Sequence, residues 1–529
     1  MRVTKGMADV RPAPEKQESH NGGADFTEGA RTRLDASYLP ASAHTGPLSL
    51  SGTRRATNPP APAVSRGFAT LLRNKLFLRL WSAQLISQTI MNAANYAMIV
   101  LVTKESDSSL ATSGAIVAFS LPALFFGAPA GVLVDRFDRR LVMWVSNILR
   151  AIATVVFILA LIFAPRSVWP VYALTFFIAM VGQFFTPAEG AAIPRLVHRG
   201  ELMNALALFN ITFTLAQAAG LIVIGPLALL LIPQFRLGGA HYGITVTPII
   251  SLFVVITALY LVCALLILSI PRRVLRSPDA VVVTESGKRR RHEGARLRGI
   301  WSGIMESYRF IRKDVVLHIA VWQLTLAGII VSVVAMIAPR FVQIFFHKPP
   351  EAAALVFIPA GIGLVIGSVV TPTIARRLRY AHTITAGVII LAGSIALLVI
   401  GYASAPYIFG AQWWSAWPYL GGMLSFTFLI GIGLDLINVP AQTMVQERSP
   451  DRIKGRVLAV QIMLLNAIIV VYVPAVGWIA DHMGLGAALL VVAGSVGAAG
   501  LLTVYLGART GAQNADLTDG QRGAPEGNA

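Results

Sequence analysis

The sequence predicts an all-α integral membrane protein in which twelve transmembrane helices form two pseudo-symmetric halves of six. Composition is the first observation behind this fold class. Of 529 residues, 55% are hydrophobic and 13% are charged, whereas an ordinary soluble domain carries about 25% charged residues. Twelve long apolar stretches are the second observation, and a motif that recurs in both halves is the third. The composition alone excludes a soluble enzyme.

The charges are few and mostly positive. Lys and Arg number 44 against 25 Asp and Glu, which leaves a formal net charge of +19. A nucleic-acid-binding protein would be basic but would also keep a charged surface, so no nucleic-acid partner is expected. Basic loops between apolar spans account for both observations. The single cysteine, Cys263, excludes a disulfide framework and a cysteine-based metal site, and no cofactor is expected.

Twelve stretches are long and apolar enough to cross the bilayer, which needs about 20 residues in a helix. Because twelve is even, both termini are predicted on the same side of the membrane. The stretches are residues 77–103, 110–134, 141–164, 168–187, 203–232, 246–270, 316–343, 352–375, 382–404, 416–440, 455–480 and 485–507.

The basic residues of the loops orient the chain. The loops on the side opposite the termini carry few basic residues, and the positive-inside rule therefore places both termini in the cytoplasm. The predicted location is a bacterial plasma membrane, crossed many times. The loops on the side of the termini hold Arg136, Arg139, Arg140, Arg195, Arg199, Arg376, Arg377, Arg379, Arg448, Arg452, Lys454 and Arg456.

Five segments are predicted along the chain. Residues 1–76 and 508–529 are expected to be disordered cytoplasmic segments, because they hold no apolar run that could build a core. Residues 77–270 and 316–507 are the two six-helix halves, and residues 271–315 are a basic cytoplasmic linker that joins them.

The second part of this linker has a helical pattern. Apolar residues recur there at Ile300, Ile304, Tyr308 and Ile311, which predicts an amphipathic helix on the inner membrane face. Membrane lipid is therefore an expected partner of the linker and of the basic flanks.

Corresponding motifs in the two halves indicate a duplication. Pro187-Ala188 closes span four and Pro440-Ala441 closes span ten, so the motifs recur about 250 residues apart. A parallel repeat of six-span halves is a common architecture of secondary transporters. The prolines either mark places where the halves rock or simply end helices.

The loop between spans two and three carries a specific motif. It reads Gly131-Val-Leu-Val-Asp135-Arg136-Phe-Asp-Arg139-Arg140. Together with Gly127, Gly131 gives span two a small-residue strip suited to close helix contact. An acid at the membrane edge, Asp135, can face the positive N-terminal end of a neighbouring helix. The alternative is a charged loop that only sets topology.

This motif resembles the loop signature of the major facilitator superfamily, with every defining position present. The resemblance implies that Asp135 faces the start of span eleven, near Arg456, and that this contact locks the cytoplasmic side shut. The predicted conformational latch therefore comprises Gly131, Asp135, Arg136, Arg139, Arg140 and Arg456.

A second resemblance is narrower and extends over residues 77–507. Phe184-Phe-Thr-Pro187-Ala188-Glu189 and the residues after it, with the counterpart from Asn438 to Arg456, are similar to the superfamily branch of enterobactin exporters and macrolide-efflux proteins. The resemblance implies proton-driven export of a bulky or amphipathic small molecule. Gly225-Pro226 in span five partly resembles the antiporter signature, and a kink that fits the span around the bundle is the alternative reading.

Polar residues inside the spans predict a substrate cavity, because each is costly in lipid and is usually turned inward. They fall on narrow helical faces of spans one and five, and Arg150 adds an ionisable group on span three. Interhelical hydrogen bonding without a cavity is the alternative. The candidate cavity residues are Gln84, Gln88, Asn92, Asn95, Arg150, Asn210, Thr214 and Gln217.

Asp435 in span ten and Glu189 after span four are the candidates for proton coupling. Relatives in the resembled branch often carry an acid in the first half of span one, where this chain has Asn92 and Asn95. The proton is therefore expected on Asp435 or Glu189, if transport is coupled to protons at all. A structural contact with Asn438 or a nearby arginine is the alternative role for Asp435.

The sequence therefore predicts a monomeric secondary transporter that exports a small molecule by alternating access. An importer or a lipid-moving relative is the alternative within transport, and a sensor that has kept the fold without transport is the alternative outside it. An enzyme is disfavoured, because no nucleotide-binding, zinc-protease or serine-hydrolase motif occurs.

Overall fold

The structure is a computed structural model that describes residues 68–134, 137–164, 167–237, 244–275, 303–450 and 453–522. Within these residues, twelve helices are long and apolar enough to cross a membrane, which confirms the predicted number of spans. The spans are Lys75–Ser106, Ser109–Gly127, Arg139–Phe163, Trp169–Leu196, Leu202–Leu231, Pro248–Leu268, Val315–Phe345, Pro350–Ala375, Tyr380–Phe409, Trp417–Arg448, Lys454–His482 and Leu485–Thr503.

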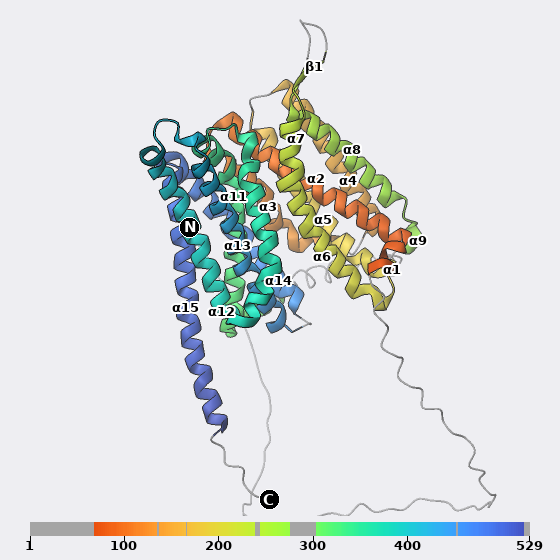
Figure 1. Cartoon of the computed structure of the whole chain (residues 1–529). Coiled ribbons are helices and arrows are strands. Elements are labelled where there is room, and N and C mark those ends of the chain that lie inside the picture. Colours follow the sequence, from red (N-terminus) through yellow and green to blue (C-terminus); the bar gives the residue numbers. More distant parts are fainter. Residues whose placement is uncertain are drawn as a thin grey trace, which may run out of the picture. The chain divides into compact units, whose positions relative to one another are not determined.

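The first six spans form one half of the bundle, coloured red to yellow-green in Figure 1. Helix α3 packs on α5, α4 packs on α5 and α8, and α2 packs on α6 and α8. The elements of this half are α1 (Phe68–Arg73), α2 (Lys75–Ser106), α3 (Ser109–Val134), α4 (Arg139–Phe163), α5 (Trp169–Leu196), the 3₁₀ turn η1 (Arg199–Glu201), α6 (Leu202–Ala218), the π-helical turn η2 (Ala219–Ile224), α7 (Gly225–Leu231), β1 (Phe235–Leu237), β2 (Ile244–Val246), α8 (Pro248–Leu268) and α9 (Arg272–Leu275).

The last six spans form the second half, coloured green to blue in Figure 1. Helix α12 packs on α13 and α15, and α11 packs on α13 and α14. The two halves meet mainly where α3 packs on α14. The elements are α11 (Val315–Phe345), the 3₁₀ turn η4 (Pro350–Ala353), α12 (Ala354–Phe409), the 3₁₀ turn η5 (Trp413–Ser415), α13 (Trp417–Arg448), α14 (Lys454–His482) and α15 (Leu485–Arg522).

Helix α12 carries parts of two spans, Pro350–Ala375 and Tyr380–Phe409, which are joined by a short segment at residues 376–379. Gly363, near its start, lies against the carbonyl of Phe428 on α13. Gly387, further along α12, lies against Leu436 of the same helix α13. Both arms of α12 therefore flank α13, and the basic residues predicted between spans eight and nine lie in this joining segment.

The hydrophobic core divides differently at the two ends of the bundle. We call the ends at Lys75 and Val134 the inner ends, and the ends at Ser106 and Ser109 the outer ends. Toward the outer ends, one cluster joins side chains of both halves, such as Tyr96 of α2 and Phe357 of α12. At the inner ends, each half has its own cluster. The halves therefore share a core toward the outer side and have separate cores on the inner side.

The ends of several predicted segments need correction. The segment predicted as disordered through residue 76 is helical from Phe68, and Leu71 of α1 is fully buried. Helix α15 continues to Arg522 and so includes part of the predicted disordered tail. Strands β1 and β2 form an antiparallel pair between α7 and α8, where no strand was expected. Helix ends and a short strand pair of this kind are not visible in the hydropathy of the sequence, so the pattern could not predict them.

Span five is not a simple kinked helix. Its middle is the π-helical turn η2, which packs directly on α2. A Cβ added at Gly220 would lie 2.3 Å from the carbonyl oxygen of Thr89 and 2.7 Å from the Cβ of Asn92. Only glycine allows this approach, because a backbone oxygen cannot move aside as a flexible side chain can. Gly225 lies in the same way against the ring of Tyr96.

Replacing Gly220 with valine is expected to destabilise the protein. The added side chain would force span five away from α2, and overpacking of this kind typically costs about 1–3 kcal/mol. The measurement is the melting temperature of the purified protein in detergent. Gly393→Val is the matched control, because a Cβ at Gly393 of α12 would meet nothing within 4 Å. Equal melting temperatures for the two variants would contradict the close contact.

Candidate functional site

A cluster of buried polar side chains surrounds Arg150 in the first half. Arg150 lies on α4 with 3% of its surface exposed. Its Nη1 donates to the hydroxyl of Ser87 on α2 at 3.0 Å. Its guanidinium carbon lies 5.3 Å from the ring centre of Phe185 on α5 and 5.8 Å from that of Tyr260 on α8. Four helices of one half therefore converge on a single cation, which stacks on two aromatic faces.

Glu189 lies one turn along α5 from Phe185 and is also buried. When both groups are ionised, its carboxylate and the Arg150 guanidinium attract each other within this cluster. Its Oε1 has no hydrogen-bond partner among the described residues, and neither Arg150 Nε nor the Tyr260 hydroxyl has one. A buried polar group without a partner is costly. The cluster is therefore able to take up further hydrogen bonds from water, protons or a ligand.

Asp435 is a second buried carboxylate, on α13 of the other half. It is 2% exposed, its Oδ2 has no hydrogen-bond partner in the described part of the chain, and the side chain of Asn438 lies close enough to interact with it. A Cβ added at Gly367 of α12 would lie 2.8 Å from the Cβ of Asp435. The carboxylate is therefore wedged between α12 and α13. The contact with Asn438 agrees with the structural role considered for Asp435, while the unpartnered oxygen leaves room for a proton.

The polar stripe predicted on span one is mostly buried. Gln84, Gln88 and Asn92 are each less than 10% exposed, and Asn92 donates to the carbonyl of Gln88 on its own helix. Asn95 is half-buried with an unpartnered Oδ1. Because Asn92 is covered by η2, helix packing is favoured over a cavity at that position.

The stripe predicted on span five behaves differently. Asn210 and Gln217 of α6 are exposed, as residues that line an open cavity would be. The side chain of Thr214 lies outside the described part of the structure. The two stripes therefore do not share one environment, and a cavity between them stays a prediction.

Three of the predicted latch residues contact residues of the same half or of the linker. Asp135 and Arg136 lie outside the described residues. Arg139 donates to the carbonyl of Ala191 and Arg140 to that of Leu268, both in the first half. Arg456 donates to Glu306 of the linker at 3.3 Å.

The small-residue strip predicted on span two is not used in this conformation. A Cβ at Gly131 would meet nothing within 4 Å, and one at Gly127 would meet Gln183 at an ordinary contact distance of 3.6 Å. The expected close helix contact at Gly131 is therefore absent from the described residues here. This fits a structure in which the inner ends of the halves have separate cores.

The predicted amphipathic helix is present at residues 303–313, and Ile300 lies outside the described residues. Its buried stripe is Gly303, Ser307 and Ile311, and Ile311 belongs to the inner cluster of the second half. Tyr308, predicted on the apolar face, is 45% exposed. The helix therefore packs on the inner ends of α13 and α14, because small residues at every fourth position permit a close approach.

The comparisons with known proteins identify the family. The model of the Major Facilitator Superfamily matches residues 80–461, which is most of the membrane region. The chain belongs to this superfamily. Its fold and family are those of transporters, and a transporter of this superfamily binds a small-molecule substrate.

Several known bacterial proteins are similar to this transporter in sequence. The uncharacterized MFS-type transporter YfiS of Bacillus subtilis is 22% identical over 428 residues, 79% of this chain and 91% of that protein. The multidrug efflux pump Tap of Mycolicibacterium fortuitum is 25% identical over 415 residues, 77% of this chain and 89% of that protein. Macrolide efflux protein A of Streptococcus pyogenes is 31% identical over only 126 residues, 24% of this chain and 31% of that protein.

Solved structures show the same fold at low identity. The nucleoside transporter NupG aligns with a TM-score of 0.58 at 12% identity, over 82% of this chain and 98% of that one. A bacterial homologue of the iron transporter ferroportin, in an inward-facing state, aligns with a TM-score of 0.58 at 13% identity, over 82% and 99%. At these identities the likeness establishes the fold alone.

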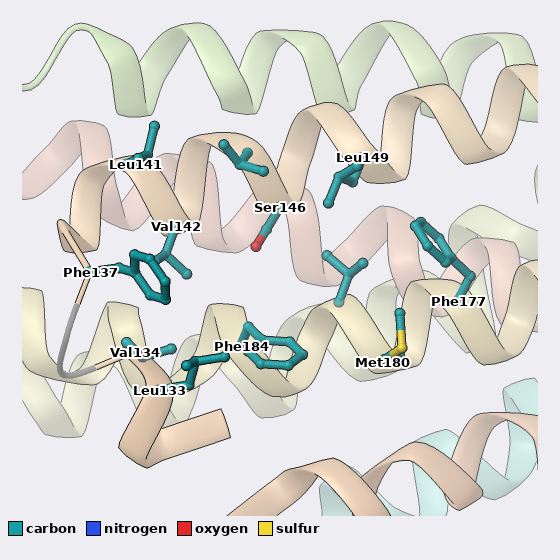
Figure 2. A pocket seen from close by; sticks show the side chains of 12 residues that line it. Leu133, Val134, Phe137, Leu141, Val142, Ser146, Leu149, Phe177, Met180 and Phe184 are labelled. Carbon is teal, nitrogen blue, oxygen red and sulfur yellow. The ribbon is translucent and has the colours of Figure 1, made fainter. Parts of the chain in front are cut away.

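An apolar groove of about 300 Å³ lies between α4 and α5, beside the inner end of α3. Figure 2 shows its side chains, with the hydroxyl of Ser146 as the polar atom among them. The groove opens at exposed apolar residues, including Leu133, Phe137 and Leu141. It does not contain the carboxylates described above.

Sequence patterns alone missed several partners. Ser87 and Tyr260 contact Arg150 from spans one and six, and neither stands out within an apolar span. Asp481 was missed because span eleven was predicted to end at residue 480. Its position as an acid directly after a span would have been the signal, and its contacts are described below.

Replacing Arg150 with glutamine is expected to lower the free energy of unfolding by about 1–3 kcal/mol, because the charged hydrogen bond to Ser87 is lost and a nearby positive charge is removed from Glu189. The double variant Arg150→Gln/Glu189→Gln should recover part of this loss. Equilibrium unfolding in mixed micelles measures both. Strictly additive effects of the two single substitutions would show that the charges do not act as a pair.

Proposed function

We propose that the transporter is a proton-coupled exporter of small amphipathic molecules. The observation that carries the proposal is that each half holds a buried carboxylate with an unpartnered oxygen, Glu189 in the first half and Asp435 in the second. A carboxylate inside a membrane bundle marks an ion pathway more often than a structural contact. Asp435 is the first candidate, because it has no ion-pair partner among the described residues, whereas Glu189 interacts with Arg150.

The direction of transport is proposed from relatives. The Tap protein is named a multidrug efflux pump, and macrolide efflux protein A is named for export. The first name gives several drugs as substrates, and the second gives a macrolide. The apolar groove between α4 and α5 agrees with molecules that reach the transporter through the lipid.

We place the inner ends in the cytoplasm. Basic residues gather there, including Arg73 at the end of α1, Lys75 and Arg79 at the start of α2, and Arg448 at the end of α13. The positive-inside rule assigns this side to the cytoplasm, and both termini with it. The transporter then acts as a monomer in a plasma membrane, and no subunit contact is needed to complete either carboxylate site.

Alternating access follows from the division of the core. The shared cluster toward the outer ends closes that side, and the separate inner clusters let the halves part on the cytoplasmic side. Substrate is taken up from the inside in this conformation. The halves then rock, the outer side opens, and a proton from outside replaces the substrate. The proton leaves Asp435 when the inner side opens again.

Replacing Asp435 with asparagine is expected to abolish transport driven by a pH gradient while leaving substrate binding intact, because asparagine cannot release a proton. The measurement is uptake of a panel of fluorescent dyes and macrolides into inverted membrane vesicles with an imposed pH gradient. Substrate exchange without a gradient reports binding and rocking, and should survive. Undiminished gradient-driven uptake would remove Asp435 from the mechanism.

Asn438→Ala is the matched control for this experiment. It removes the amide that interacts with Asp435 but keeps the carboxylate. If Asp435 only supports Asn438, both substitutions should lower thermal stability and leave the response to pH unchanged. If Asp435 carries the proton, only Asp435→Asn should uncouple transport from the gradient.

A further inference from the structure

We propose that Asp481, at the end of α14, is the latch that holds the outer side of the transporter closed. It is a positioning residue: it fixes the first turn of α3 against α14 and so sets how often the outer side opens. The inference rests on the proposed alternating access, but not on protons, substrate or direction.

The carboxylate of Asp481 caps the start of α3 from the other half. Its oxygens accept from the hydroxyl of Ser108 at 2.6 Å, the backbone N–H of Ser109 at 2.8 Å and the backbone N–H of Leu110 at 3.0 Å. The first N–H groups of a helix have no partner within that helix, and its N-terminus attracts negative charge. One carboxylate of α14 thus accepts hydrogen bonds from N–H groups at the start of α3 that would otherwise have no partner where the two helices meet.

The backbones beneath this cap are in close contact. Gly477 lies one turn before Asp481 on α14, and a Cβ there would sit 2.9 Å from the carbonyl oxygen of Ser109 and 3.1 Å from the N–H nitrogen of Leu110. The carboxylate therefore reaches the end of α3 without stretching. The contact joins the same two helices through which the halves chiefly meet.

Two ion pairs flank the cap and also join the halves. Arg340 of α11 contacts Asp107 at 2.7 Å, and Lys104 of α2 contacts Glu351 of η4 at 2.6 Å. In each pair one side chain is more than half exposed. Exposed pairs contribute little and are screened by salt. Asp481 instead is half-buried and accepts three hydrogen bonds, so it is the strongest polar contact of this set.

The geometry distinguishes a latch from a structural cap. A structural cap joins elements of one half and persists throughout the cycle. Asp481 joins the two halves, and its three bonds must break whenever the outer ends separate. Its loss should therefore shift the population towards the outward-open state, because only the closed state contains these bonds.

Labelling of a buried cysteine tests the latch. Thr112 lies one turn into α3 and is fully buried, and its hydroxyl donates to the carbonyl of Ser108. In a Cys263→Ser background, Thr112→Cys is labelled by a membrane-impermeant maleimide added to the outer side of oriented vesicles. Adding Asp481→Ala is expected to raise the labelling rate about tenfold, with a smaller rise for Asp481→Asn, as loss of a charged hydrogen bond predicts.

Glu105→Gln is the matched control. It also removes a negative charge at the outer side, but Glu105 is an exposed side chain near the end of α2. It should leave the labelling rate unchanged. Equal labelling in the Asp481 variants and the parent would overturn the proposal, whether or not their melting temperatures fall. If Asp481→Ala does not fold, Ser108→Ala removes one donor and should still raise labelling. None of these measurements involves substrate or a pH gradient. Failure of the latch proposal can therefore be distinguished from failure of the proposed proton coupling.

Discussion

A charged side chain inside an apolar span is tolerated only where the protein replaces the hydration that water would give it. This constraint organises the interior of the first half. Arg150 is surrounded by a hydroxyl and two aromatic rings from three other helices, and four spans of the first half are oriented by that cation. Asp435 is enclosed between α12 and α13. The first half is therefore organised around its buried charge, whereas Asp435 of the second half keeps one unpartnered oxygen.

The interface between the halves, in contrast, holds its charged contacts at the surface. Its inner part lacks a common core among the described residues, and its outer part combines apolar packing with polar contacts at the membrane surface. Charges at the surface can exchange protein partners for water with little loss of free energy, whereas Arg150 cannot leave its cluster. Motion is therefore easy between the halves and strongly opposed within them. A rigid half that rocks as one body is the mechanical result.

The sequence was sufficient for features that depend on one segment at a time. Span number and the helix at residues 303–313 follow from apolar length and periodicity, which any single helix displays. Contacts between distant segments leave no such pattern. Ser87 looks like an ordinary residue of span one until Arg150 lies against it, and the buried stripe of the linker helix uses Gly303 and Ser307, which hydropathy does not count as core. The π-helical turn of span five depends on α2 in the same way.

A latch in a transporter must be strong enough to define a state and weak enough to open within each cycle. Three hydrogen bonds to one carboxylate would stabilise the closed outer side by several kcal/mol if nothing replaced them, at about 1.5–3 kcal/mol each. Water replaces them on opening, because Asp481 is half-buried near the surface. The net free energy by which Asp481 favours the closed state is then small. It is comparable with the few kcal/mol that separate the conformations of a two-state protein. The position of the carboxylate at the rim, rather than deeper along α14, is what makes the contact both specific and reversible.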